Sequence, residues 1–345
     1  MQRKSRLHYS LRAKVSLGAI IITLVCAGVA LGLYRIQATG TKYTGPLESV
    51  STGFIGEYAA LILVAQDQGY FEDNGLRVTT TAYSSGPAAL QDVFNGKLDT
   101  AMAADFAGVR ETLNGKDLKI LATMSKSKAF FMVANKARGI NTVSDIKGKR
   151  IGITRKTVGE FYLGRFLVTH NITLKDVTIV DMPQSELLKA QKEGQLDAAV
   201  LFEPNAYKAR AQLGNQAIQW SVQGEDDLYS LLYTTSKMTR ERPEVLDRYM
   251  RAVVSAERFV KSHNDRARAI IAKRLHYEQA YINYIWPRFT FQASLEQELL
   301  IGLDDKARWA IENQLTPATQ PVNYLRAIYF EGLERAKPEG VSVIR

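Results

Sequence analysis

Two carboxylates occupy equivalent positions in a short pattern that the chain carries twice. GKLDTAMAAD spans residues 96–105 and GQLDAAVLFE spans residues 194–203, so the two copies end at Asp105 and Glu203. A carboxylate in a closing cleft loses its water and needs an N–H donor or a cation in exchange. If both acids face such a cleft, the ligand is expected to carry N–H donors or positive charge. The alternative is that Asp105 caps the following helix and Glu203 pairs with a surface base.

Two short turns combine hydroxyl groups with backbone N–H groups. Each turn joins the end of a predicted strand to the start of a predicted helix, where the helix dipole favours negative charge. Both turns are predicted to contact a ligand, and simple capping of the two helices is the alternative. The predicted contact residues are Ser84, Ser85, Gly86, Thr157, Val158 and Gly159.

Three further side chains are candidates for the same site. Tyr58 lies between the first predicted strand and the first predicted helix, and its ring is predicted to cover an apolar part of the ligand. A core aromatic is the alternative for this position. Arg155 and Lys156 precede the second turn, where they either neutralise an anionic ligand or face solvent.

The repeated pattern itself predicts an αβ unit. Each copy follows a helix-like stretch that ends at a glycine suited to a left-handed cap, Gly96 or Gly194, and then runs through an apolar strand. In open α/β sheets, ligands bind outside the carboxyl ends of the strands. Two such units that face each other therefore predict a two-lobed clamp around a small molecule.

Strand and helix signals alternate from residue 48 onward, which indicates α/β lobes with parallel sheets covered by helices. Residues 130–139 and 228–235 are predicted to cross between the lobes, and residues after 237 read as helical. The predicted organisation is a basic end, membrane segment and tether at residues 1–42, a first lobe at 43–138 plus 233–345, and a second lobe at 139–232.

The first residues predict a membrane-targeting segment. Residues 1–14 carry five basic side chains and no acid, and residues 15–34 are apolar apart from Ser16 and Thr23. Twenty apolar residues match the length that spans a bilayer, so we expect an N-terminal transmembrane helix that remains as an anchor in the inner (plasma) membrane. Cleavage as a signal peptide, or lipidation at Cys26, is the alternative. The rest of the chain is expected to be exported to the periplasmic or extracellular face.

The net charge of +10 does not indicate nucleic-acid binding. Seven of the 45 basic residues precede Glu48 with no acid among them, so the remainder carries 38 basic against 35 acidic residues. No basic and aromatic stripe follows that would track a phosphate backbone. Cys26 is the only cysteine, which excludes disulfides and thiolate metal sites from the exported part. No cofactor and no metal site is predicted.

Four segments occur in order between residues 52 and 235. They are AALILVAQDQGYFEDNGLRV at 59–78, SSGPAALQDVFNGKLD at 84–99, DIKGKRIGIT at 145–154 and GQLDAAVLFEP at 194–204. Together they resemble the substrate-binding proteins of ABC importers for nitrate, sulfonates, taurine and thiamine-pyrimidine precursors, the NMT1/THI5-like or SsuA/TauA group. The resemblance implies the type II periplasmic binding-protein fold, with two lobes joined by two crossings.

The resemblance also implies a function and partners. It implies a monomeric binding unit that closes on a small-molecule solute through the two turns and delivers it to an ABC permease and its ATPase. With both acids in the cleft, the solute is expected to be a nitrogen-bearing sulfonate or a pyrimidine-like compound. A membrane-tethered sensor read by a signalling partner remains the alternative.

An enzyme is a weaker hypothesis for this chain. A branch of the same superfamily makes a thiamine-pyrimidine precursor with a cysteine-rich segment and a histidine. This chain has no cysteine beyond Cys26, and its four histidines do not cluster in the sequence. No GxGxxG, HExxH or phosphate-binding P-loop pattern occurs. We therefore expect a binding protein without catalytic residues.

Overall fold

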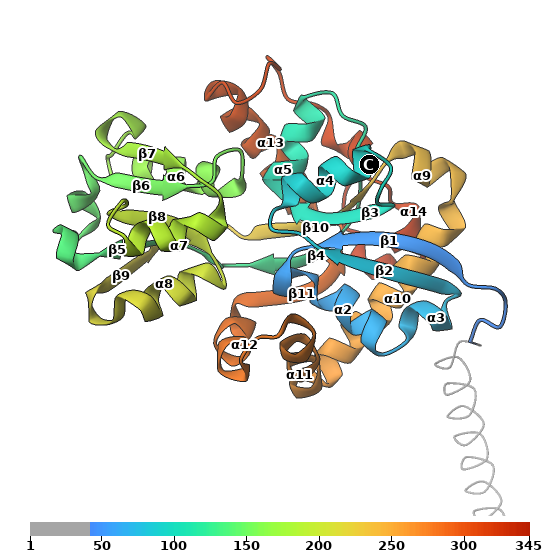
Figure 1. Ribbon diagram of the computed structural model, residues 1–345. Coiled ribbons are helices and arrows are strands. Elements are labelled where there is room, and N and C mark those ends of the chain that lie inside the picture. The colour runs from blue at the N-terminus through green and yellow to red at the C-terminus, as the bar shows by residue number, and fades with distance from the viewer. Residues whose placement is uncertain (1–41) are drawn as a thin grey trace, which may run out of the picture. The chain divides into compact units, whose positions relative to one another are not determined.

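Two β-sheets organise the chain in the computed structural model, which describes residues 42–345 (Figure 1). The six-stranded sheet has the order β11 (Phe289–Ser294), β4 (Lys119–Ser127), β10 (Leu228–Thr234), β3 (Thr100–Ala104), β1 (Glu48–Phe54) and β2 (Leu76–Ala82). The five-stranded sheet has the order β7 (Thr178–Asp181), β6 (Arg150–Ile153), β8 (Ala198–Phe202), β5 (Phe130–Asn135) and β9 (Ala217–Ser221). Each sheet with its helices forms one lobe, as the sequence predicted.

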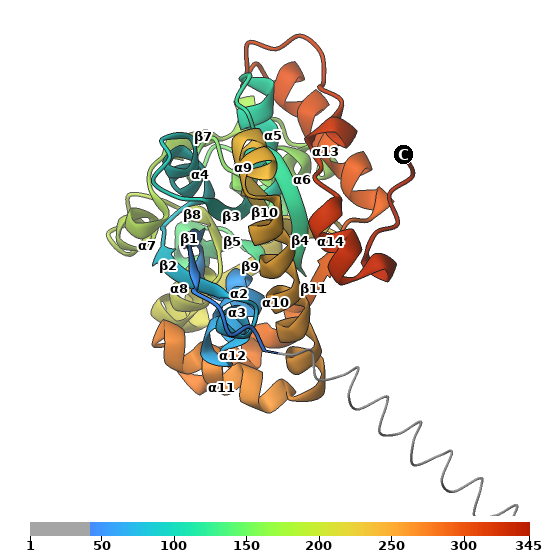
Figure 2. The same ribbon diagram turned by 90° about the vertical axis from the view of Figure 1, so that its right-hand side faces the viewer.

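Helices pack against both sheets. Those of the first lobe are α2 (Ala60–Asp67), α3 (Tyr70–Asp73), α4 (Gly86–Phe94), α5 (Asp105–Leu113), α9 (Ser236–Glu241), α10 (Pro243–Ser262), α11 (Asn264–Leu275), α12 (Gln279–Ile285), α13 (Gln297–Glu312) and α14 (Glu331–Ala336). Those of the second lobe are α6 (Val158–Thr169), α7 (Gln184–Lys192) and α8 (Asn205–Leu213). The long helix α10 packs on α2 and α14, and Figure 2 shows it running along the first lobe.

The predicted membrane segment at residues 15–34 lies outside the described residues. None of the helices within residues 42–345 has the length and apolar character that crossing a membrane requires.

The two halves of the repeat adopt the same local structure. Gly96 and Gly194 both have a left-handed backbone, with φ of 71° and 72°. After each glycine a leucine packs against a glycine of the neighbouring strand, Leu98 on Gly53 and Leu196 on Gly152. β3 then runs parallel to β1, and β8 runs parallel to β6. The expectation of one αβ unit used twice agrees with this geometry.

The crossings between the lobes lie elsewhere than the sequence indicated. β5, which was expected to be part of the first crossing, pairs with β8 and β9 of the second sheet. β10 pairs with β3 and β4 of the first sheet. The chain therefore crosses at residues 128–129 and 222–227 rather than near residues 138 and 233. An apolar strand looks the same in sequence whichever sheet it joins, because its own residues do not specify its partners.

Two further features differ from the prediction of parallel sheets and a helical C-terminal region: some strands are antiparallel, and one strand lies within the C-terminal region. β5 and β10 are antiparallel to their neighbours, so both sheets are mixed rather than parallel. β11 lies in the region expected to be helical and pairs with β4. Its Phe289, Phe291 and Ala293 are buried while Thr290 is exposed, a period of two that is typical of a strand.

The lobes are in contact along α6 and α13. Trp309 of α13 packs so close to Gly164 of α6 that a Cβ at Gly164 would lie 2.6 Å from the indole. Phe161 of α6 meets the same indole edge-on at 5.3 Å. Arg165 forms an ion pair of 2.6 Å with Asp305 on the solvent side. The two lobes are therefore in direct contact at α6 and α13.

Candidate functional site

A cavity of about 70 Å³, partly open to solvent, lies where the two lobes meet. It is bounded by the carboxyl ends of β1, β3 and β8 and by the first residues of α4 and α6, as expected for an α/β clamp. The lining is mostly apolar and contains no charged side chain. The lining residues are Ile55, Tyr58, Ser85, Gly86, Pro87, Met102, Ala103, Ala104, Ala107, Phe130, Thr157, Val158, Phe202, Leu228 and Ser230.

Ser85 and Gly86 bring the start of α4 to the cavity wall. Ser85 has an extended backbone at the N-cap, and its side chain makes no capping hydrogen bond, so its hydroxyl remains available to a ligand. Gly86 is required by packing, because a Cβ there would lie 2.8 Å from the Cβ of Ala103. The first N–H groups of a helix have no partner within the helix, which suits them to bind an acceptor.

Thr157 and Val158 form the equivalent wall in the second lobe. Thr157 caps α6, since its Oγ1 accepts a hydrogen bond from Gly159 N at 3.3 Å and donates to Thr154 O at 2.7 Å. The Thr157 hydroxyl therefore caps the helix, which was the alternative to ligand contact. Thr157 and Val158 nevertheless line the cavity. Gly159 does not line it, and Ser84 is exposed outside it.

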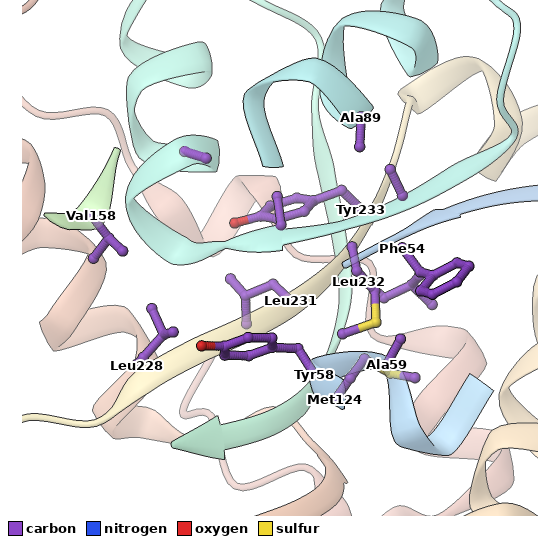
Figure 3. Close-up of a cluster of buried hydrophobic side chains, with 14 of the residues drawn as sticks. Phe54, Tyr58, Ala59, Ala89, Met124, Val158, Leu228, Leu231, Leu232 and Tyr233 are labelled. Carbon is purple, nitrogen blue, oxygen red and sulfur yellow. The ribbon is translucent and has the colours of Figure 1, made fainter. Parts of the chain in front are cut away.

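Tyr58 supplies both an aromatic wall and an unpaired hydroxyl. Its ring meets Phe289 edge-on at 5.1 Å and Phe202 of the second lobe at 6.5 Å. Figure 3 shows the Tyr58 hydroxyl directed toward Leu228 and Val158. This hydroxyl is buried without a hydrogen-bond partner among the described residues, and burial raises the pKa of Tyr58 well above its usual value. An unpaired buried hydroxyl costs roughly 1–3 kcal/mol, which a ligand acceptor would recover.

Asp105 does not line the cavity. It is buried with Oδ2 3.3 Å from the Nζ of Lys306, and Oδ1 accepts a hydrogen bond of 2.7 Å from Phe106 N. Burial raises the pKa of Asp105, and the ammonium of Lys306 opposes that shift. The prediction that this carboxylate faces the ligand is therefore not supported, because α13 supplies a cation from 201 residues farther along the chain.

Glu203 is also absent from the lining. Its Oε2 accepts a hydrogen bond of 2.8 Å from Tyr207 N, and its Oε1 lies 3.4 Å from the guanidinium of Arg210. The hydroxyl of Tyr284, on α12 of the first lobe, donates to the same oxygen at 3.3 Å. Burial raises the pKa of Glu203, and Arg210 opposes the shift. Glu203 thus makes a contact between the lobes beside the cavity.

Arg155 and Lys156 are exposed, in agreement with the solvent-facing alternative. Arg155 lies 3.5 Å from Glu160, and the backbone N–H of Lys156 donates to Glu160 at 2.8 Å. Neither side chain lines the cavity.

Sequence reasoning missed most of the apolar lining. Phe202 directly precedes Glu203 at the carboxyl end of β8, so the rule that ligands bind at that end was sufficient to find it. Phe130 and Leu228 begin the strands β5 and β10 directly after the two crossings. They were obscured because both segments were interpreted as the crossings themselves.

Residues 57–267 match the family model described as NMT1/THI5 like. A Bacillus subtilis protein named as an aliphatic sulfonates-binding protein is 28% identical over 214 residues, which cover 60% of this chain and 64% of that protein. The chain thus spans a little under two thirds of the length of that relative.

Solved structures show the same fold. The alkanesulfonate-binding protein SsuA from Xanthomonas axonopodis pv. citri, bound to MOPS, has a TM-score of 0.71 at 17% identity, covering 83% of this chain and 100% of that chain. The periplasmic aliphatic sulphonate binding protein SsuA from Escherichia coli has a TM-score of 0.68 at 17% identity, covering 82% and 97%. The protein has the α/β periplasmic binding-protein fold, and the family match spans more than half of its length. The chain belongs to the NMT1/THI5-like family.

Proposed function

We propose that the chain is the extracytoplasmic solute-binding protein of an ABC importer, and that it closes on a solute with an apolar body and one small polar or anionic head group. The observation that carries this proposal is the cavity between the lobes, whose lining is apolar apart from a few hydroxyl and N–H groups. Delivery to a permease and anchoring of the chain in the inner membrane are part of the proposal.

The chemistry of the lining changes the expected solute. The reason to expect N–H donors or positive charge on the ligand was that Asp105 and Glu203 would face the cleft. Both acids are paired within the protein, by Lys306 and by Arg210, so they do not repel an anion. The starts of α4 and α6 then offer a favourable dipole to an anionic head, while Thr157 already accepts the Gly159 N–H and Pro87 has no N–H to donate.

We expect the apolar body of the solute to lie in the aromatic part of the cavity. Phe202 packs against Phe130 at 5.6 Å and against Tyr58 at 6.5 Å, so the three rings form one aromatic wall, which Met102 and Leu228 extend. Burial of apolar surface contributes about 25 cal/mol per Å², so a longer apolar body binds more tightly until the cavity is full. A relative named for aliphatic sulfonates and a similar fold bound to MOPS support an alkanesulfonate-like class.

Titration calorimetry with a chain-length series tests the proposal. Ethane-, butane- and hexanesulfonate are compared with nitrate and taurine on protein purified free of ligand. We expect affinity to rise about fourfold for each methylene, because a buried CH₂ contributes about 0.8 kcal/mol. Phe202→Ala is expected to flatten that slope. Equal affinity along the series, or preference for nitrate or taurine, would contradict the proposal.

A further inference from the structure

Arg110 of α5 is a buried base without an acidic partner. Arg110 is 8% exposed, and within residues 42–345 its guanidinium contacts a backbone oxygen rather than a carboxylate. One hydrogen bond is present, from Nη1 to the backbone oxygen of Lys156 at 3.2 Å, and Nε is buried with no partner in residues 42–345. Other enclosed bases of this chain differ, since Lys306 pairs with Asp105 and Lys337 pairs with Glu257.

A buried charge of this kind is costly. Charged side chains are almost never fully buried unless paired, and an unpaired ion in a region of low polarity loses hydration without compensation. The carbonyl of Lys156 offsets only part of this cost because it carries no charge. The guanidinium of Arg110 therefore favours the arrival of an anion nearby.

Arg110 does not itself line the cavity, but it lies next to residues that do. Helical side chains lean toward the N-terminus of their helix, so Arg110 covers the turn that contains Ala107, and Ala107 lines the cavity. On the other side, the carbonyl that Arg110 binds belongs to Lys156, and the next two residues, Thr157 and Val158, also line the cavity. The guanidinium thus lies at the junction of the two lobes, next to the start of α6.

We propose that Arg110 is a specificity-determining residue whose buried positive charge makes the closed cleft select solutes with an anionic head group over neutral ones of the same shape. This inference rests on the proposed function as a solute-binding protein. Because the same guanidinium binds the backbone of the second lobe, its charge is in place only when the lobes are closed. Selection for the anion is therefore coupled to closure.

A matched pair of probes tests the assignment. Hexane-1-sulfonate and hexane-1-sulfonamide have nearly the same shape, but the sulfonamide is uncharged at neutral pH. Dissociation constants of both are measured by calorimetry for the wild type, Arg110→Gln and Arg110→Lys. We expect Arg110→Gln to weaken sulfonate binding roughly ten- to hundredfold and sulfonamide binding far less, because only the charged head group is attracted by a guanidinium that lies next to the cavity. Arg110→Lys is expected to restore most of the preference for the anion.

The control removes the same charge from an exposed contact between the lobes. Arg165→Gln breaks the ion pair with Asp305, which lies in solvent, and should change both dissociation constants equally and little. Equal losses for both probes in Arg110→Gln would show a purely structural role and overturn the inference. A wild type that binds both probes with equal affinity would overturn it without any variant. Binding of neither probe by the wild type would instead reject the proposed function.

Discussion

Lys306 Nζ lies 3.3 Å from Asp105 Oδ2, and both residues are almost completely buried. This ion pair joins α13 to the start of α5 on the wall behind the cavity. It replaces the hypothesis that the Asp105 carboxylate binds the ligand. Asp105 is a structural residue here, so its loss is expected to affect stability more than affinity.

Lys306→Met should destabilise the protein strongly, because it leaves a buried carboxylate without compensation. Loss of one partner of a buried pair costs about 3–5 kcal/mol, measurable as a lower urea midpoint. The double variant Asp105→Asn with Lys306→Met should recover part of this loss. Arg308→Met serves as the control, since its pair with Asp304 is exposed. A Lys306→Met midpoint equal to that of the control would refute the structural role.

Tyr58→Phe should separate the contribution of the Tyr58 ring to ligand binding from that of its hydroxyl. Removing an unpaired buried hydroxyl should leave the melting temperature unchanged or slightly higher. The affinity for hexanesulfonate should fall about two- to tenfold, the amount of one hydrogen bond. Tyr233→Phe is the control, because its hydroxyl is also buried and unpaired but does not line the cavity. Equal effects of the two variants on affinity would show that Tyr58 donates nothing to the ligand.

Gly164→Val should hinder closure of the lobes. Even a Cβ at this position would lie 2.6 Å from the indole of Trp309, so the branched side chain must push α6 and α13 apart. We expect weaker ligand binding together with a larger radius of gyration in solution scattering. Gly302→Ala on α13 is the control, because its Cβ would meet its nearest neighbour at an ordinary 3.7 Å. A compact Gly164→Val protein with normal affinity would show that this contact does not govern closure.

Glu57 should make stability depend on pH. Burial raises the pKa of Glu57 from 4.5 to about 7, although Tyr281 donates a hydrogen bond of 2.5 Å to its Oε1. The folded state therefore holds this proton more tightly than the unfolded state. Its contribution is fully present below pH 4.5 and is lost as the pH rises through 7, about 3 kcal/mol in total.

The variant Glu57→Gln isolates this contribution from that of Glu203 and Asp105, whose pKa values are also raised by burial. Urea unfolding of the wild type and Glu57→Gln at several values of pH gives the difference in their free energies of unfolding. We expect that difference to change by about 3 kcal/mol between pH 4.5 and pH 8.5, with the wild type losing stability at high pH. A constant difference would mean that Glu57 titrates at its usual pKa.

The location of the cavity was predictable from the sequence. Whether the side chains of Asp105 and Glu203 face that cavity was not. The repeat placed residues 105 and 203 correctly at the carboxyl ends of β3 and β8, because glycine caps and apolar strands are local signals. Whether an acid faces the cavity depends on its partners. Lys306 and Tyr284 come from helices far along the chain, and no local pattern connects them to Asp105 or Glu203.

The same distinction explains the errors in the fold. The strands β5 and β10 were visible as apolar segments, but sheet membership is set by pairing across long separations. β11 carried a local signal in its alternating Phe289, Thr290 and Phe291, which the helical periodicity of the surrounding residues obscured. Of the residues predicted to contact a ligand, Tyr58, Ser85, Gly86, Thr157 and Val158 line the cavity, and their contact with a solute stays a prediction.

A crystal structure of the protein grown with hexane-1-sulfonate tests the central claim most directly. We expect the alkyl chain to lie against Phe130, Phe202 and Tyr58, and the sulfonate to face the starts of α4 and α6, with the pairs of Asp105 and Glu203 intact. A head group bound by the carboxylate of Asp105 or Glu203, or a solute bound outside the cavity between the lobes, would contradict it.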